Sequence, residues 1–162
     1  MTAKAHPFSI RPATTADLPL IVFQRRAMFE EMGIRDRSAL DAMNAAFADW
    51  MKGRIERGEY RGWFVTDDRG AVLAGAGMWL QESSPSPHDS STRRAYVMNV
   101  YTAPEYRHQG HARRLMEAVM ECVREQGIRT VTLHASDAGR ALYESLGLKS
   151  TNEMRIVLPP KE

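Results

Sequence analysis

The chain has little cysteine and no long apolar run, and each of these absences argues against a class of protein. Its 162 residues include one cysteine, Cys122. A single cysteine cannot form a disulfide within the chain, so we expect a reducing, cytoplasmic setting rather than a disulfide-stabilised scaffold. No apolar run approaches the about 20 residues that a membrane-spanning helix needs. The stretch 1–7 also lacks the apolar core of a signal peptide, so we expect no membrane association.

The chain also lacks a large excess of charge of either sign. The 22 basic and 20 acidic residues leave a net charge of +2, and basic residues cluster only as pairs, as at 93–94 and 113–114. Nucleic-acid binding needs clustered positive charge, so we expect no nucleic-acid partner. The five histidines show none of the spacings of metal sites, and we expect no metal.

What remains is an ordinary globular composition. Hydrophobic residues make up 43% and charged residues 26% of the chain. A chain of this length can bury a sizeable core, and we find neither an internal repeat nor a linker. We therefore expect one domain over residues 1–162.

Hydrophobic periodicity predicts alternating strands and helices. The expected strands are 8–11, 60–66, 71–80, 94–102, 128–134 and 154–158, and the expected helices are 18–32, 36–57, 110–126 and 137–146. Thr14 and Asp17 form a capping-box pattern before the first helix. This order predicts an α/β domain around one mixed, twisted sheet, in which 95–102 and 128–134 are parallel strands joined by a right-handed crossover.

The stretch from Val97 to Ala112 is the most informative part of the sequence. A β-type run ends at Thr102, a proline-containing turn follows, and Gly110 lies where an amphipathic helix begins. A helix N-terminus presents free backbone N–H groups and the positive end of the helix dipole, which together suit a phosphate. Gly110 has no Cβ, so the backbone there can approach an anion closely. Arg107 and Arg113 add positive charge.

This stretch resembles the signature of the GNAT superfamily of acetyl-CoA-dependent N-acetyltransferases. The pattern Gln/Arg-x-x-Gly-x-Gly/Ala is matched by Arg107-x-x-Gly110-x-Ala112, and the residues 99–107 before it are similar to those of many members. Downstream, 141–148 resembles the family's Ala-x-x-Tyr-x-x-x-Gly-Phe ending, with Leu148 in place of phenylalanine. The specific resemblance covers residues 95 to 150.

The resemblance implies a fold and a cosubstrate site. In the GNAT fold two parallel central strands splay apart, helices flank the sheet, and acyl-CoA lies in the gap; here the strands would be 95–102 and 128–134. Backbone N–H groups of the glycine loop would bind the pyrophosphate, and the end of the first strand would hold the pantetheine arm and polarise the thioester carbonyl. The residues implied for acetyl-CoA are Val100, Tyr101, Thr102, Arg107, His108, Gln109, Gly110, His111, Ala112 and Arg113.

The resemblance also suggests catalytic residues. Tyr143 lies where members often carry a general acid that protonates the departing thiolate, although a helical tyrosine also suits plain core packing. Some members carry a glutamate base on the strand that ends at Thr102, but Asn99 occupies a comparable position and cannot accept a proton. The base therefore stays open. His134 is a candidate because histidine ordinarily titrates near neutral pH, and it equally suits a structural role. The other candidates are Glu82, His88, Asp89 and a water relay.

These features predict an N-acetyltransferase. A neutral primary amine, on a small molecule or a protein, would attack the thioester directly without a covalent enzyme intermediate. The first two helices and the loop 81–92 would flank the acceptor pocket, where acidic side chains such as Glu30, Glu31 and Asp41 either attract a cationic amine or are simply solvated. The alternative is a non-catalytic acyl-CoA-binding sensor or regulatory module. Whether the protein is a monomer or a homodimer stays open.

Overall fold

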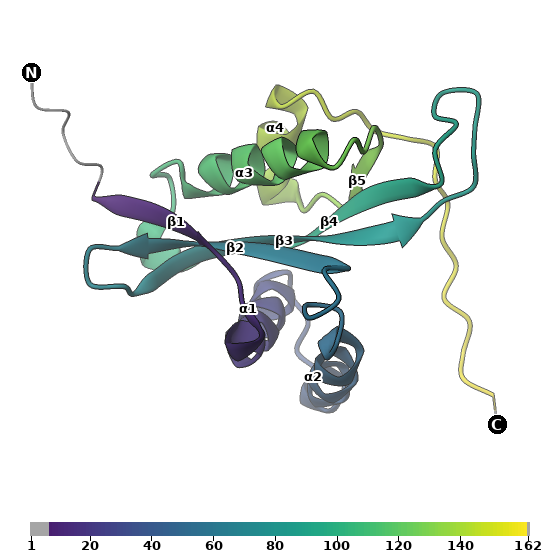
Figure 1. Cartoon of the computed structure of the whole chain (residues 1–162). Helices are drawn as coiled ribbons and strands as arrows, with labels where there is room; N and C mark the ends of the chain where they lie inside the picture. The colour runs from purple at the N-terminus through teal and green to yellow at the C-terminus, as the bar shows by residue number, and fades with distance from the viewer. Residues whose placement is uncertain (1–6, 162) are drawn as a thin grey trace, which may run out of the picture.

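Five strands form one sheet, in the order β1-β2-β3-β4-β5 (Figure 1). The computed structural model describes residues 7–161; residues 1–6, in the stretch expected to lack a signal peptide, lie outside the described part. The strands are β1 (Phe8–Pro12), β2 (Tyr60–Asp67), β3 (Val72–Glu82), β4 (Arg93–Thr102) and β5 (Val131–Leu133). Neighbours from β1 to β4 are antiparallel, whereas β4 and β5 are parallel. The predicted mixed sheet is confirmed.

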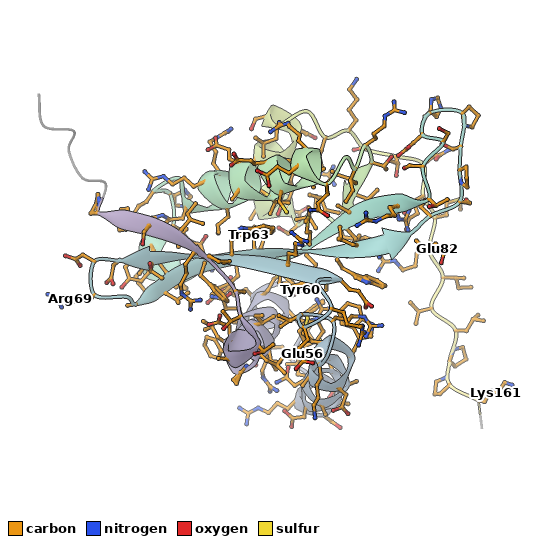
Figure 2. All side chains as sticks on the ribbon, viewed as in Figure 1. Glu56, Tyr60, Trp63, Arg69, Glu82 and Lys161 are labelled. Atoms are coloured by element: carbon orange, nitrogen blue, oxygen red, sulfur yellow. The ribbon has the colours of Figure 1, made fainter. Side chains whose placement is uncertain are left out.

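Helices cover both faces of this sheet (Figure 1). One face carries α1 (Leu18–Glu31) and α2 (Arg37–Met51); the other carries α3 (His111–Glu125) and α4 (Asp137–Ser145). Short 3₁₀ turns, η1 (Thr15–Asp17) and η2 (Pro104–Tyr106), precede α1 and α3. Side chains fill the space on each side of the sheet (Figure 2).

The side chains of β4 point alternately to the α3/α4 side and the α1/α2 side of the sheet. Ala95 and Val97 are buried in the cluster that includes Leu115 of α3, whereas Met98 packs with the cluster that includes Phe47 of α2. Successive strand residues point to opposite faces of a sheet, so Tyr96 lies on the α1/α2 side with Met98.

The parallel strands separate soon after they meet. β4 and β5 are paired only from Ala95↔Val131 to Val97↔Leu133, while β4 continues to Thr102. The β3–β4 register shifts between Gly75 and Gly77, and the extra β4 residues include Asn99, whose φ is 57°. A bulge bends its strand and increases the local twist. The carboxyl half of β4 therefore diverges from β5, which is the predicted splay.

The bounds of two predicted elements were wrong. α2 ends at Met51 rather than near Gly58, because Gly53 takes a φ of 83° and residues 53–58 form separate turns. β5 is shorter than 128–134, because Ile128 N–H bonds to Val123 O and so belongs to the end of α3.

The predicted last strand, 154–158, does not form. Within the described chain, no backbone hydrogen bond joins residues 149–161 to the sheet. Met154, Ile156, Val157 and Leu158 are mostly exposed. The apolar, β-type pattern is present, but a strand also needs a neighbouring edge, and the chain runs past β5 without pairing.

The predicted capping box is present at the start of η1. Asp17 accepts a hydrogen bond from Thr14 N at 2.7 Å and pairs with Arg11 Nη2 at 2.8 Å. The Arg11 hydrogen bond, aided by Thr14, holds the pKa of the Asp17 carboxyl at about 2. This contact fixes the strand β1 to the beginning of α1.

Replacing Asp17 with asparagine should therefore cost stability in a pH-dependent way. The folded pKa lies below the unfolded value of about 4, so the ionised carboxylate stabilises the fold above about pH 4, and this contribution is lost as the pH falls towards 2. At pH 7 we expect Asp17→Asn to lower the free energy of unfolding by about 1–2 kcal/mol, less than the full linkage value because Arg11 is 40% exposed. Chemical denaturation across this pH range measures the difference. A gap between wild type and variant that stays constant down to pH 2 would contradict this assignment.

Candidate active site

The loop between η2 and α3 is shaped to hold an anion. His108 and Gly110 both take left-handed conformations, with φ of 60° and 81°. Within residues 7–161, the N–H groups of residues 108–113 have no backbone acceptor. A Cβ added at Gly110 would meet nothing within 4 Å, so this side of the loop is open. Successive free N–H groups at a helix N-terminus form a phosphate-binding concavity, and the loop fits a pyrophosphate.

The arginines of this segment are engaged within the protein. Arg107 donates Nε to Thr102 O at 3.0 Å, and its Nη2 lies 2.5 Å from Glu31 Oε2. Arg113 donates Nη2 to Ser145 Oγ at 2.8 Å. These bonds brace the loop against β4 and α1, and α3 against α4. Both of these arginine side chains therefore already have partners within the protein.

His111 is the first residue of α3, and its ring is buried. The side chain is 2% exposed and packs edge-on against Phe8, with ring centroids 4.7 Å apart. Within residues 7–161, neither ring nitrogen has a hydrogen-bond partner. Burial, and secondarily the charge of Arg114, lowers the pKa of His111, so the ring stays neutral at physiological pH.

The end of β4 presents a free backbone edge to the gap. Tyr101 and Thr102 pair with Gly75 and Ala74 of β3. On the other side, pairing with β5 stops at Val97, so residues 98–102 have no strand neighbour there in the described part of the chain. This edge, with Val100 in it, is where the family resemblance places the pantetheine arm.

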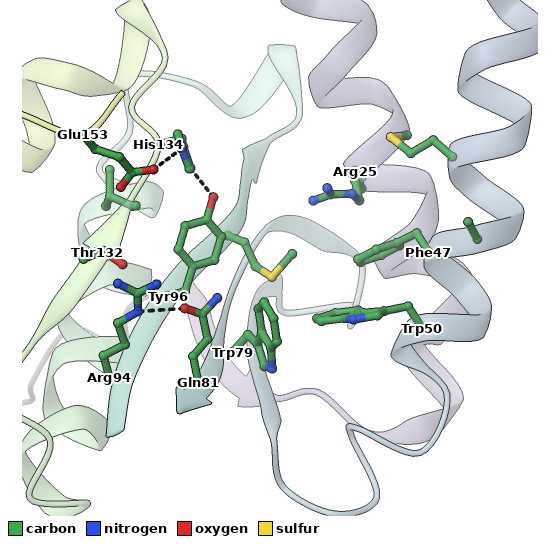
Figure 3. Close-up of a pocket in the computed structure, with 14 residues that line it drawn as sticks. Arg25, Phe47, Trp50, Trp79, Gln81, Arg94, Tyr96, Thr132, His134 and Glu153 are labelled. Atoms are coloured by element: carbon green, nitrogen blue, oxygen red, sulfur yellow. Dashed lines mark hydrogen bonds and ion pairs between the residues drawn. The ribbon is translucent and has the colours of Figure 1, made fainter. Parts of the chain in front are cut away.

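A cavity of about 610 Å³ lies on the α1/α2 side of this gap (Figure 3). α1, α2, β3, β4 and β5 all contribute to its walls. Its lining residues are Arg25, Met43, Ala46, Phe47, Trp50, Trp79, Gln81, Arg94, Tyr96, Met98, Thr132, Leu133, His134 and Glu153. The first two helices were expected beside such a pocket and do line it, whereas residues 82–92 do not.

One wall of the cavity carries a chain of polar contacts (Figure 3). The Tyr96 hydroxyl hydrogen-bonds to His134 Nδ1. His134 Nε2 lies 4.0 Å from Glu153 Oε1, and the His134 side chain is 53% exposed. Burial raises the pKa of Tyr96. His134 thus reaches the cavity surface with one nitrogen held by a phenol and the other near a carboxylate.

Asn99 hydrogen-bonds to two side chains on the opposite side of the cavity from His134. Its Oδ1 accepts a hydrogen bond from Arg25 Nη1 at 2.9 Å, and its Nδ2 donates to Tyr60 Oη at 3.3 Å. Asn99 is 4% exposed, and burial raises the pKa of Tyr60 to about 12. The side chain fixes the bulge and positions Arg25, in keeping with an amide that cannot act as a base.

Tyr143 lies on the other face of the sheet. It is 8% exposed and belongs to the cluster between the sheet and α3, with Val97 and Leu115. Burial raises the pKa of Tyr143, which keeps the phenol protonated at neutral pH. His134 lines the cavity on the α1/α2 side, so the two candidates lie on opposite sides of the sheet.

The loop candidates for a base lie outside the cavity lining. Asp89 accepts hydrogen bonds from Thr130 Oγ1 at 2.5 Å and from Ser91 N at 3.0 Å. The Thr130 bond, followed by those to Ser91, holds the pKa of Asp89 at about 2. Asp89 ties the loop to the segment before β5. Glu82 and His88 are exposed.

Sequence reasoning missed Arg25, Tyr96 and the two cavity tryptophans. Arg25 carried a signal: it lies on the apolar stripe of α1, four residues after Ile21 and four before Phe29, where a charge is out of place. Tyr96 had no such signal, because a tyrosine in a strand is ordinary.

Two kinds of feature are absent from the part of the chain that the structure describes. Residues 7–161 contain no group of three or more His, Cys, Asp or Glu side chains arranged to hold a metal ion. Among the described helices, none is both long and apolar enough to span a membrane.

Comparison with known proteins identifies the family. The model of the acetyltransferase (GNAT) family matches residues 25–148. The chain therefore belongs to the GNAT acetyltransferase family and is an acyltransferase. A search of curated proteins found no match.

Solved structures agree with this assignment. A GCN5-related N-acetyltransferase from Ralstonia eutropha is 36% identical, with a TM-score of 0.88 over 93% of this chain and 98% of that one. A predicted acetyltransferase with acetyl-CoA from Clostridium acetobutylicum is 21% identical, with a TM-score of 0.85 over 93% and 96%. AAC(6')-Iy in complex with the bisubstrate analogue CoA-S-monomethyl-acetylneamine is 18% identical, with a TM-score of 0.67 over 98% and 99%. The last two likenesses concern the fold.

Proposed function

We propose that this protein transfers the acetyl group of acetyl-CoA to a primary amine by direct attack. The observation that carries the proposal is the splay between β4 and β5, with an anion-binding loop beside one strand and a cavity on the α1/α2 side. The amine nitrogen forms an amide bond to the acetyl carbon as the carbon–sulfur bond of acetyl-CoA breaks. One proton leaves the amine and one reaches the sulfur. The free Cys122 supports a cytoplasmic setting.

The backbone supplies binding and polarisation in this proposal. The N–H groups of residues 108–113 bind the pyrophosphate, and the free edge of β4 at Val100–Thr102 binds the pantetheine arm. An N–H at the bulge after Asn99 polarises the thioester carbonyl, since a fixed dipole costs no reorganisation during the reaction. The left-handed φ of Asn99 redirects the backbone at this point.

His134 is the proposed general base. The role requires the tautomer with hydrogen on Nδ1, donated to the Tyr96 hydroxyl oxygen, because Nε2 is then unprotonated. Nε2 takes the proton from the amine, and Glu153 Oε1 lies 4.0 Å from it. Tyr96 orients the ring and also lines the cavity.

Tyr143 is the proposed general acid, and Tyr143→Phe tests it. The substitution removes one hydroxyl and keeps a ring that packs over Gly139. Loss of a general acid typically costs about 10²–10⁴-fold, but a thiolate is already a fair leaving group, so we expect turnover to fall only about tenfold. The affinity for acetyl-CoA should be unchanged, because the proton is transferred in the transition state.

Turnover and binding on one preparation of Tyr143→Phe check this role. Wild-type turnover in the variant would mean that Tyr143 only packs in the core. Water would then be the proton donor.

A non-catalytic acyl-CoA sensor is the second candidate, and the absence of a carboxylate at Asn99 favours it. The two candidates differ in one observable. An enzyme releases thiol from acetyl-CoA slowly by itself and much faster with a suitable amine. A sensor binds acetyl-CoA with no amine-stimulated release.

A further inference from the structure

Arg25 is a partly buried cation without a counter-ion. It forms no ion pair within residues 7–161, and its Nε is buried without a hydrogen-bond partner. Its guanidinium lies 4.5 Å from the ring centroid of Phe47 and 5.1 Å from that of Phe29. Burial lowers the pKa of Arg25. A charge held away from water is costly unless a partner of opposite charge reaches it.

The acidic residues of α1 and α2 do not supply that partner. Glu30 and Asp41 both bind Arg26, at 2.9 Å and 2.6 Å, and Glu31 binds Arg107. None of these three side chains lines the cavity. Among the cavity-lining residues, Arg25 and Arg94 are cationic and only Glu153 is acidic.

The neighbouring wall is aromatic. Trp50 and Trp79 meet edge to face with centroids 4.8 Å apart, and Phe47 stacks on Trp50 at 5.9 Å. Figure 3 shows these rings beside Arg25, across the cavity from His134. Flat apolar groups pack well on such a surface. The cavity thus offers three chemistries: a guanidinium, an aromatic wall and a histidine.

We propose that the acceptor is an amine that also carries a carboxylate and an aromatic or apolar body. The carboxylate binds the Arg25 guanidinium, whose planar fork of N–H donors matches it. The body packs on Trp50 and Trp79, and the amine faces His134. This inference rests on the proposed function, which makes the cavity the acceptor site.

Matched pairs of amines test the inference. Phenylalanine is compared with 2-phenylethylamine, and 4-(aminomethyl)phenylacetate with 4-methylbenzylamine. Within each pair only the first amine carries a carboxylate. Between the two pairs, the distance from the carboxylate to the amine differs. In at least one pair we expect kcat/KM to be about 10–100-fold higher for the carboxylate, the usual value of a hydrogen bond to a charged group. Arg25→Gln should bring that ratio to near one, and Arg25→Lys should keep part of it.

Arg26→Gln is the control variant, because Arg26 neighbours Arg25 on α1 but pairs with surface carboxylates outside the cavity. It should keep the wild-type ratio. Quenching of tryptophan fluorescence by the same amines, read in the wild type and in Arg25→Gln, measures binding without turnover.

The outcomes separate the two proposals. Turnover with no carboxylate preference, or a preference that Arg25→Gln leaves intact, overturns the inference while the acetyltransferase stands. Arg25-dependent binding of the carboxylates without thiol release supports the anion site and contradicts the enzyme. Neither binding nor turnover of any carboxylate amine overturns the inference.

Discussion

Replacing Gly110 with valine is expected to lower the affinity for CoA at least tenfold, and on the order of a hundredfold. Gly110 has a φ of 81°, and the side where a Cβ would stand is open. A branched side chain there occupies the space in which a pyrophosphate approaches the backbone, and it disfavours the left-handed conformation that exposes the N–H groups. Several charge-assisted hydrogen bonds are lost together. Titration calorimetry with CoA measures the change.

Gly127→Val is the matched control for this experiment. Gly127 lies at the other end of α3, has a φ of 65°, and also has nothing within 4 Å of an added Cβ. Both variants carry a similar backbone strain, so both should lose similar stability, but only Gly110→Val should lose CoA affinity. Equal affinity in the two variants would mean that the glycine loop is only a connection between β4 and α3.

Replacing His134 with glutamine is expected to reduce turnover about 10²-fold near neutral pH. A positioned base typically contributes about 10²–10⁴-fold, and an amine that is already partly neutral needs less help. The defect should shrink as the pH rises through the pKa of the amine, because the attacking nitrogen then needs less help in losing its proton. Acetyl-CoA affinity should be unchanged.

The pH dependence of kcat/KM in His134→Gln and His88→Gln checks this assignment. His88 is exposed on the loop outside the cavity lining, so His88→Gln should match the wild type. If His134→Gln keeps wild-type turnover across the pH range, His134 only orients Tyr96, and water becomes the proton acceptor.

Local patterns in the sequence predicted much of the fold. Gly110, the amphipathic stripe of α3 and the pairing of Thr14 with Asp17 depend on neighbours within a few residues, and each appears where expected. The strands β2, β3 and β4 were also placed to within about two residues, because alternating burial leaves a clear two-residue period. The last strand failed because its formation depends on a partner edge, which the sequence of the segment does not specify.

The two halves of the candidate site also differ in how far they depend on residues distant in the sequence. The anion-binding loop is a contiguous motif, so its residues could be named before the structure was known. The cavity draws single residues from five elements far apart in the chain, such as Arg25, Trp50, Trp79 and Tyr96. Their proximity follows from sheet order and helix packing, and only Arg25 showed a local anomaly. Asn99 was noticed as a departure from the family pattern, but its bonds to Arg25 and Tyr60 needed the fold.

The most direct test of the central claim uses acetyl-CoA labelled in its acetyl group. The protein is incubated with this cosubstrate and a panel of amines that includes the carboxylate pairs, and released thiol and labelled amine are both measured. The account predicts that at least one amine accelerates thiol release, that one labelled amide forms for each thiol, and that Gly110→Val loses both signals at the same acetyl-CoA concentration. Tight binding of acetyl-CoA with no label in any amine would contradict it and favour the sensor.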